Sequence, residues 1–317
     1  MVALREWKTL PCQSVWDPVL SWGPDSRTLA CGIVEGNIIL WDVYLGRVVD
    51  VLPGNGDQLD VLAFSPDGTT LASAFDGYMD EQIKLWDIKA GRRWQTAGRH
   101  ADHIYQLEFS PDGTMLASAA GEIKLWRVSS GHELRALQGL DTFDFSPDGA
   151  TIAGKAVEDS VPERRRVIRI WDVITGAEIK TLRGQTEDIY HLTFNADGTA
   201  IASLGRDSHR ERYTFTRDLI TIWTVATGQE ARVWHGGYDI NEIAFHSAGN
   251  ILATMGRYPS AGQTASIGLI NLWDVESQQI VGSVTTSKAL TAIAFSPDGS
   301  LLAGSTDQSI KVWKVVT

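Results

Sequence analysis

Seven copies of one turn-and-strand unit constrain the fold of this chain more than any other feature. Four copies of Phe-Ser-Pro-Asp-Gly stand at residues 64–68, 109–113, 145–149 and 295–299, and degenerate copies stand at 22–26, 194–198 and 245–249. Every unit ends on a tryptophan, 40 to 52 residues after the previous one: Trp41, Trp86, Trp126, Trp171, Trp223, Trp273 and Trp313. Such a period indicates a repeat fold in which each copy is one supersecondary unit.

Each unit predicts four strands, which we call a to d. In the turn, proline presets φ, aspartate bonds nearby backbone, and glycine takes the positive-φ position. Apolar alternation predicts strand a before the turn (104–109, for example) and strands b and c after it (71–73 and 83–86). A second turn, which carries glycine in most units and Gln278 in one, leads to strand d, as at 133–137. The prediction is therefore an all-β fold with four antiparallel strands per unit.

The two ends of the chain complement each other. Residues 6–10 have the pattern of a strand d without strands a to c before it, and the chain stops just after strand c of the last unit. Pairing residues 6–10 with that unit would close a ring and protect its edges. We therefore predict one domain over residues 1–317, a seven-bladed β-propeller closed by its N-terminal strand.

The repeats resemble the WD40-repeat family over the whole chain. The Trp-Asp dipeptide of that family stands at 41–42, 86–87, 171–172 and 273–274, and three units depart from it. The resemblance implies a propeller that acts as a scaffold and binds proteins or peptides on the face formed by the d–a and b–c loops. Family members often carry a histidine before strand a that bonds a strand-b Ser or Thr and the blade tryptophan. Only His100 matches here, with Ser118 and Trp126 as partners, and this loss resembles the prokaryotic branch of the family.

Charge and cysteine content narrow the function classes. The chain has 39 acidic and 28 basic residues, a net charge of −11, which repels phosphate backbones and disfavours nucleic acid. Cys12 and Cys31 have no spacing that suggests a disulfide framework or a zinc site. The N-terminus lacks a signal-peptide pattern, and no apolar stretch is long enough to cross a membrane. We predict a cytoplasmic protein that is not bound to membranes.

Residues that could suggest chemistry have structural explanations. The repeated tryptophans stand in one register on strand c, where blade packing needs a large apolar side chain. Turn chemistry explains one aspartate per unit: Asp67, Asp112, Asp148, Asp197 and Asp298. The segment 100–103, His-Ala-Asp-His, is interpreted as a loop because it lacks the spacing of a metal site. We therefore expect no catalytic residue, no cofactor and no metal.

Three long b–c hairpins, at about 155–167, 204–218 and 255–267, carry an excess of basic charge. Together they hold nine basic and six acidic residues, whereas the rest of the chain is strongly acidic. Interfaces favour Arg and Tyr, although solvated hairpins that serve solubility would show the same pattern. The candidate partner-binding residues are Arg164, Arg165, Arg166, Arg210, Arg212, Tyr213, Arg257 and Tyr258 in the hairpins, and Trp16, Tyr105, Tyr190 and Tyr238 near the start of strand a.

Three functions remain open from the sequence. The first is a non-catalytic scaffold that grips an acidic or mixed-charge protein or peptide, as a monomer or within a larger assembly. The second is a propeller that binds a small ligand, or catalyses a reaction, in its central channel. The third is nucleic-acid contact through the basic hairpins. The sequence favours the first.

Overall fold

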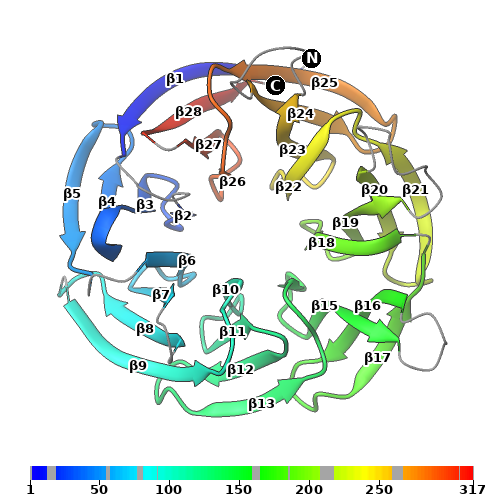
Figure 1. The fold of residues 1–317 in the computed structure, drawn as a ribbon, viewed down its shortest axis with the longest axis horizontal. Helices are drawn as coiled ribbons and strands as arrows, with labels where there is room; N and C mark the ends of the chain where they lie inside the picture. Colours follow the sequence, from blue (N-terminus) through cyan, green and yellow to red (C-terminus); the bar gives the residue numbers. More distant parts are fainter. Residues whose placement is uncertain are drawn as a thin grey trace. The chain divides into compact units, whose positions relative to one another are not determined.

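The computed structural model describes residues 2–12, 19–54, 58–76, 81–90, 92–158, 165–184, 186–207, 218–258, 267–306 and 308–316. These residues form 28 β-strands and one short 3-10 turn, η1 (Val34–Gly36). The strands make seven sheets of four antiparallel strands each (Figure 1). The fold is therefore the predicted all-β, seven-bladed propeller with four strands per blade.

The contacts between residues divide the chain into two compact units. The first, called here the N-terminal unit, consists of Arg5–Asp141 and Thr291–Val315. The second, called the central unit, consists of Thr142–Leu290 with Met1–Leu4 and Val316–Thr317. The expectation of one domain over residues 1–317 stays a prediction, and each unit is described by itself.

The N-terminal unit contains four blades, three of them formed by consecutive strands. These three are β2 (Leu20–Trp22), β3 (Thr28–Gly32), β4 (Ile38–Asp42) and β5 (Arg47–Leu52); β6 (Gln58–Phe64), β7 (Thr70–Asp76), β8 (Glu81–Asp87) and β9 (Arg92–His100); and β10 (Gln106–Phe109), β11 (Met115–Ala119), β12 (Ile123–Arg127) and β13 (Glu133–Leu137). The fourth blade combines the two ends of the chain in the order β1 (Ala3–Pro11), β28 (Ser309–Val316), β27 (Leu301–Ser305) and β26 (Ala292–Phe295).

The central unit contains the other three blades, each formed by four consecutive strands. They are β14 (Phe143–Phe145), β15 (Thr151–Glu158), β16 (Arg165–Asp172) and β17 (Glu178–Leu182); β18 (Thr186–Phe194), β19 (Ala200–Asp207), β20 (Asp218–Thr224) and β21 (Gln229–His235); and β22 (Asp239–Phe245), β23 (Ile251–Tyr258), β24 (Ile267–Asp274) and β25 (Gln279–Thr286).

The N-terminal strand completes the last blade, as predicted. β1 lies beside β28, and just beyond it the backbone N–H of Cys12 donates to the carbonyl oxygen of Gln308 at 3.1 Å. The Lys311 ammonium bonds the Glu6 carboxylate at 3.0 Å. Residues 6–10 therefore fill the place of strand d in this blade.

The Ser-Pro-Asp-Gly segments form the turns that the sequence predicts. In one of them, the Ser110 hydroxyl donates to Asp112 Oδ1 at 2.6 Å, and the same oxygen accepts the Thr114 N–H at 3.0 Å. These hydrogen bonds lower the pKa of Asp112, and the bond from Ser110 makes the largest contribution. Gly113 has φ = 70°, and Ser26 adopts φ = 52° at the same place in a degenerate copy. The repeated aspartates are thus parts of turns.

In four blades, one position in strand b supplies a hydrogen-bond acceptor for the blade tryptophan. Where that position is Ser or Thr, its hydroxyl accepts the indole N–H at 2.7–2.9 Å, as in Trp86–Ser73, Trp126–Ser118, Trp223–Ser203 and Trp273–Thr254. Where it is Cys31 or Gly304, the indole N–H of Trp41 or Trp313 has no acceptor among the described residues. All seven of these tryptophans are buried, which confirms their role in packing.

His100 makes the network that the family resemblance implies. Its Nε2 lies 2.7 Å from the Ser118 hydroxyl, which also accepts the indole N–H of Trp126. Burial lowers the pKa of His100 to about 4, with a smaller contribution from the Lys124 charge. The imidazole is therefore neutral near pH 7 and serves to hold the blade together.

Candidate functional site

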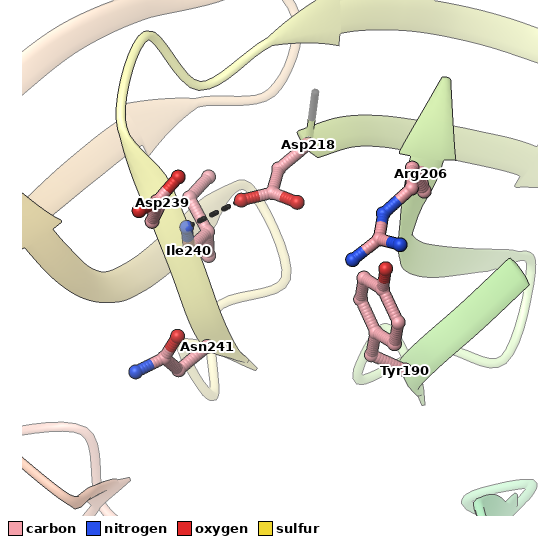
Figure 2. Close-up of a pocket in the computed structure, with 6 residues that line it drawn as sticks. All are labelled: Tyr190, Arg206, Asp218, Asp239, Ile240 and Asn241. Atoms are coloured by element: carbon pink, nitrogen blue, oxygen red, sulfur yellow. Dashed lines mark hydrogen bonds between the residues drawn. The ribbon is translucent and has the colours of Figure 1, made fainter. Parts of the chain in front are cut away.

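A cavity of about 470 Å³ lies between two neighbouring blades of the central unit (Figure 2). Its lining comes from β18, β19 and β20 of one blade and from β22 of the next: Tyr190, Arg206, Asp218, Asp239, Ile240 and Asn241. Arg206 and Asp218 face each other as the last described pair of the β19–β20 ladder. The cavity therefore lies at the base of the 204–218 hairpin, beside the d–a connection of residues 236–238.

One wall of the cavity is acidic. Asp218 Oδ2 accepts the backbone N–H of Ile240 at 2.7 Å, which ties β20 to the first strand of the next blade. Burial raises the pKa of Asp218, and the nearby Asp239 charge acts in the same direction. The Ile240 hydrogen bond and the Arg206 charge oppose that shift. Asp218 is thus a fixed carboxylate next to a second, exposed carboxylate.

The opposite wall is basic and aromatic. The Arg206 guanidinium lies over the Tyr190 ring, 5.5 Å from its centroid, which is within cation–π range. Figure 2 shows this pair across the cavity from Asp239, with Asp218 between them. Within the described part of the chain, Arg206 makes no ion pair with a carboxylate. The cavity therefore presents opposite charges on two walls that do not neutralise each other by direct contact.

Tyr190 and Arg257 are the predicted binding residues that the structure places at or beside this cavity. Tyr190 lines it, and Arg257 is exposed on β23 directly opposite Asp239 of β22. Arg166 lies on β16, with its Nε 3.8 Å from Asp188 Oδ1. Tyr105 belongs to the N-terminal unit, where the residue is 57% exposed and its ring packs edge-on against His103. Of the described candidates in the central unit, the structure therefore brings Tyr190 and Arg257 close to the cavity.

Tyr238 is in the interior and is not part of the predicted rim. Its side chain is 2% exposed, and its hydroxyl lies 2.5 Å from Thr254 Oγ1, which accepts the indole N–H of Trp273. Burial raises the pKa of Tyr238, so the phenol stays protonated. The tyrosine thus takes the structural place in its blade that His100 takes in another.

The remaining candidates lie outside what the structure describes. Trp16, Arg164, Arg210, Arg212 and Tyr213 fall outside the described residues. Arg165 and Tyr258 lie on β16 and β23, but their side chains are not described. Their proposed binding role stays a prediction.

The long segments interpreted as b–c hairpins are partly regular strand. The ladders continue to the pairs Glu158–Arg165, Arg206–Asp218 and Tyr258–Ile267. Arg166, Arg206 and Arg257 are therefore held on paired strands at the bases of these hairpins. In the first segment, residues 155–158 and 165–167 are therefore paired strand.

The acidic wall of the cavity was not predicted from the sequence. The sequence drew attention to the arginines of the 204–218 segment, whereas Asp218, Asp239 and Asn241 were not singled out. Arg206 and Asp218 become neighbours only through the register of the hairpin, and Asp239 joins them from the next blade. The signal available in the sequence was the pair of aspartates that begin β20 and β22, close to the predicted basic segment.

The described residues contain neither a metal-binding cluster nor a helix that could span a membrane. No group of three or more His, Cys, Asp and Glu side chains is arranged there to hold a metal ion. In the 100–103 segment, His100 bonds Ser118, and His103 Nδ1 lies 3.8 Å from Asp60 Oδ2. No helix of the described residues has the length and apolar character of a membrane-spanning segment.

Comparison with known proteins identifies the repeats. The family described as WD domain, G-beta repeat matches residues 46–87, 93–127, 176–209 and 278–314. The nuclear distribution protein PAC1 of Arthroderma otae is 28% identical over 213 residues, which cover 60% of this chain and 44% of that protein. The WD repeat-containing protein SL1-17 of Schistosoma mansoni is 27% identical over 195 residues, which cover 61% of this chain and 55% of that protein.

The chain spans about half the length of the curated relatives it matches. These relatives give no support to the assignment to a prokaryotic-like branch. Each matched segment includes the outer strand d of one blade and continues into the next blade. Three of them, 46–87, 93–127 and 278–314, reach the buried tryptophan of strand c, whereas 176–209 ends before it. Four segments of the chain are thus similar to WD40 repeats, and the fold is the propeller that this resemblance implies.

Proposed function

We propose that this protein is a non-catalytic scaffold that binds a protein or peptide on the face formed by its d–a and b–c loops. The observation that carries the proposal is the cavity at the base of the 204–218 hairpin and beside the connection 236–238. The base of a b–c hairpin and the start of the strand after a d–a connection therefore meet at one hollow with exposed charged side chains. WD40 propellers are generally interaction scaffolds, which supports the same conclusion.

Binding would use the arginines and tyrosines at the hairpin bases. Arg206 and Arg257 are exposed on paired strands, so less conformational freedom is lost when they fork onto a partner's carboxylate. Tyr190 offers ring surface beside them. We further propose that the hairpin tips, with Arg164, Arg165, Arg210, Arg212 and Tyr213, extend this surface.

A matched pair of charge reversals tests the proposal. The variant Arg206→Glu/Arg257→Glu changes the charge at the proposed face. The control Lys89→Glu/Arg127→Glu makes the same change in net charge at two exposed residues, one in a c–d turn and one at the end of strand c before such a turn, on the opposite side of their blades. In co-purification with mass spectrometry, the first variant should lose partners that both the wild type and the control retain. Recovery of the same partners by all three proteins would refute the assignment of this face.

The nucleic-acid alternative loses support at this cavity. Asp218 and Asp239 stand at the base of the basic hairpin and would repel a phosphate backbone. The absence of detectable RNA or DNA binding at low salt, where phosphate attraction is strongest, would agree with this. The cytoplasm remains our proposal for its location, and both cysteines are free.

A further inference from the structure

We propose that the cavity binds a mixed-charge segment of a peptide partner, with a lysine or arginine side chain between Asp218 and Asp239 and a neighbouring acidic side chain on Arg206. The inference rests on the proposed function and deepens it, because it names the chemistry of the partner. It follows from the two charged walls, from the way each is held, and from the size of the cavity.

The acidic wall is built to receive a cation. Asp218 uses Oδ2 to accept the Ile240 N–H, and its other carboxylate oxygen faces the open side toward Arg206 (Figure 2). Asp239, one residue before Ile240 on β22, brings a second negative charge close enough to act on Asp218. A cationic side chain seated there would relieve the repulsion between the two carboxylates.

The basic wall is built to receive an anion. The Tyr190 ring lies against one face of the Arg206 guanidinium, and no carboxylate of the described residues forms an ion pair with its N–H groups. A carboxylate suits that fork because it accepts two parallel hydrogen bonds from one guanidinium. Arg206 therefore selects an acidic group at the position next to the bound cation.

Size and charge together favour a peptide segment. The cavity, about 470 Å³, falls in the range typical of small-molecule sites, about 300–1,000 Å³. That volume suits a few side chains of a peptide better than a whole protein surface. A purely acidic segment would meet Asp218 and Asp239, and a purely basic one would meet Arg206, so only a mixed segment satisfies both walls.

Binding of defined peptides tests the inference. Four fluorescein-labelled peptides would share one Gly-Ser frame and differ only in the central pair: Lys-Glu, Lys-Gln, Gln-Glu or Gln-Gln. Fluorescence anisotropy with the full chain at low salt gives their affinities. We expect the Lys-Glu peptide to bind at least about tenfold more tightly than Gln-Gln, since charge-assisted hydrogen bonds are roughly twice as strong as neutral ones.

Two variants test the contributions of the acidic wall and the basic wall separately. Asp239→Asn should remove the advantage of lysine and leave that of glutamate, and Arg206→Gln should do the reverse. Asp239 is exposed and makes no side-chain hydrogen bond in the described part of the chain, so its variant should keep the wild-type circular dichroism spectrum. Lys89→Gln is the control and should change none of the four affinities.

The inference fails if wild type binds all four peptides equally, or if either variant weakens all of them by the same factor. That failure is distinct from failure of the proposed function. If Arg206→Glu/Arg257→Glu still loses native partners while the peptides show no preference, the face binds partners but the mixed-charge recognition is wrong.

Discussion

The Thr254 hydroxyl contacts two buried polar side chains, so we expect it to contribute measurably to the free energy of unfolding. Its Oγ1 accepts the indole N–H of Trp273 at 2.9 Å and lies 2.5 Å from the Tyr238 hydroxyl. Thr254→Val keeps the shape of the side chain and removes that hydroxyl. The indole N–H then has no acceptor in a buried position.

The expected loss has two parts. Leaving the Trp273 N–H unsatisfied costs about 1–3 kcal/mol. Tyr238 loses less, about 0.5–1.5 kcal/mol, because its hydroxyl also lies 3.3 Å from the Thr254 carbonyl oxygen. Thr254→Val should therefore lower the free energy of unfolding by about 2–4 kcal/mol, and Tyr238→Phe by about 1 kcal/mol.

Urea unfolding of the two single variants and the double variant measures the coupling. Because both changes remove the same hydroxyl–hydroxyl bond, the double variant should lose about 1 kcal/mol less than the sum of the single losses. Thr285→Val, at an exposed position of β25, is the control and should stay within about 0.5 kcal/mol of wild type. A loss below 0.5 kcal/mol for Thr254→Val, or strict additivity, would refute the network.

Three further predictions concern the backbone conformation of Gln278, the protonation of His100 and the burial of the two cysteines. Gln278→Gly should raise the free energy of unfolding by about 1 kcal/mol, because Gln278 has φ = 58°, a conformation that glycine adopts without strain. Lowering the pH from 6.5 to 4 should lower the free energy of unfolding, because His100 has a pKa of about 4 in the fold and its unfolded form binds a proton in that window. His100→Gln should remove up to about 3 kcal/mol of this fall. Cys12 and Cys31 are 1% and 0% exposed, so a thiol reagent should label them only after denaturation.

Each of these three predictions would be contradicted by a specific experimental result. A urea midpoint of Gln278→Gly equal to or below that of wild type would show that the positive φ carries no strain. An unchanged pH profile in His100→Gln would assign the acid sensitivity to other groups, such as His191, whose pKa burial also lowers. Rapid labelling of either cysteine in the native protein would contradict its place in the core.

The fold could be predicted because the same local pattern of turn and strand residues recurs in every repeat. Turn residues such as Asp112 and Gly113 and the register of tryptophans such as Trp126 act within one blade, so each copy is independent evidence for the same four strands. The pairing of β1 with β28 could also be predicted, because residues 6–10 have the pattern of the missing strand. Most of the fold could therefore be predicted from local sequence patterns.

The site could be predicted only in part because it depends on register and on contacts between blades. From the sequence, Tyr238 is expected at the surface, near the start of strand a. In the structure its hydroxyl bonds Thr254, 16 residues later, and the side chain is buried. Asp218 meets Ile240 across a blade boundary, which no single repeat specifies. The basic residues were visible in the sequence, whereas the carboxylates that complement them became visible only in three dimensions.

A crystal structure of this chain with the Lys-Glu peptide would show whether the cavity binds a mixed-charge segment. We expect the lysine ammonium within about 3 Å of an Asp218 or Asp239 oxygen, and the glutamate carboxylate at a similar distance from the Arg206 guanidinium. The Tyr190 ring should remain against that guanidinium. A peptide bound elsewhere, or an Arg206 side chain turned away from the cavity with the peptide in place, would contradict this expectation.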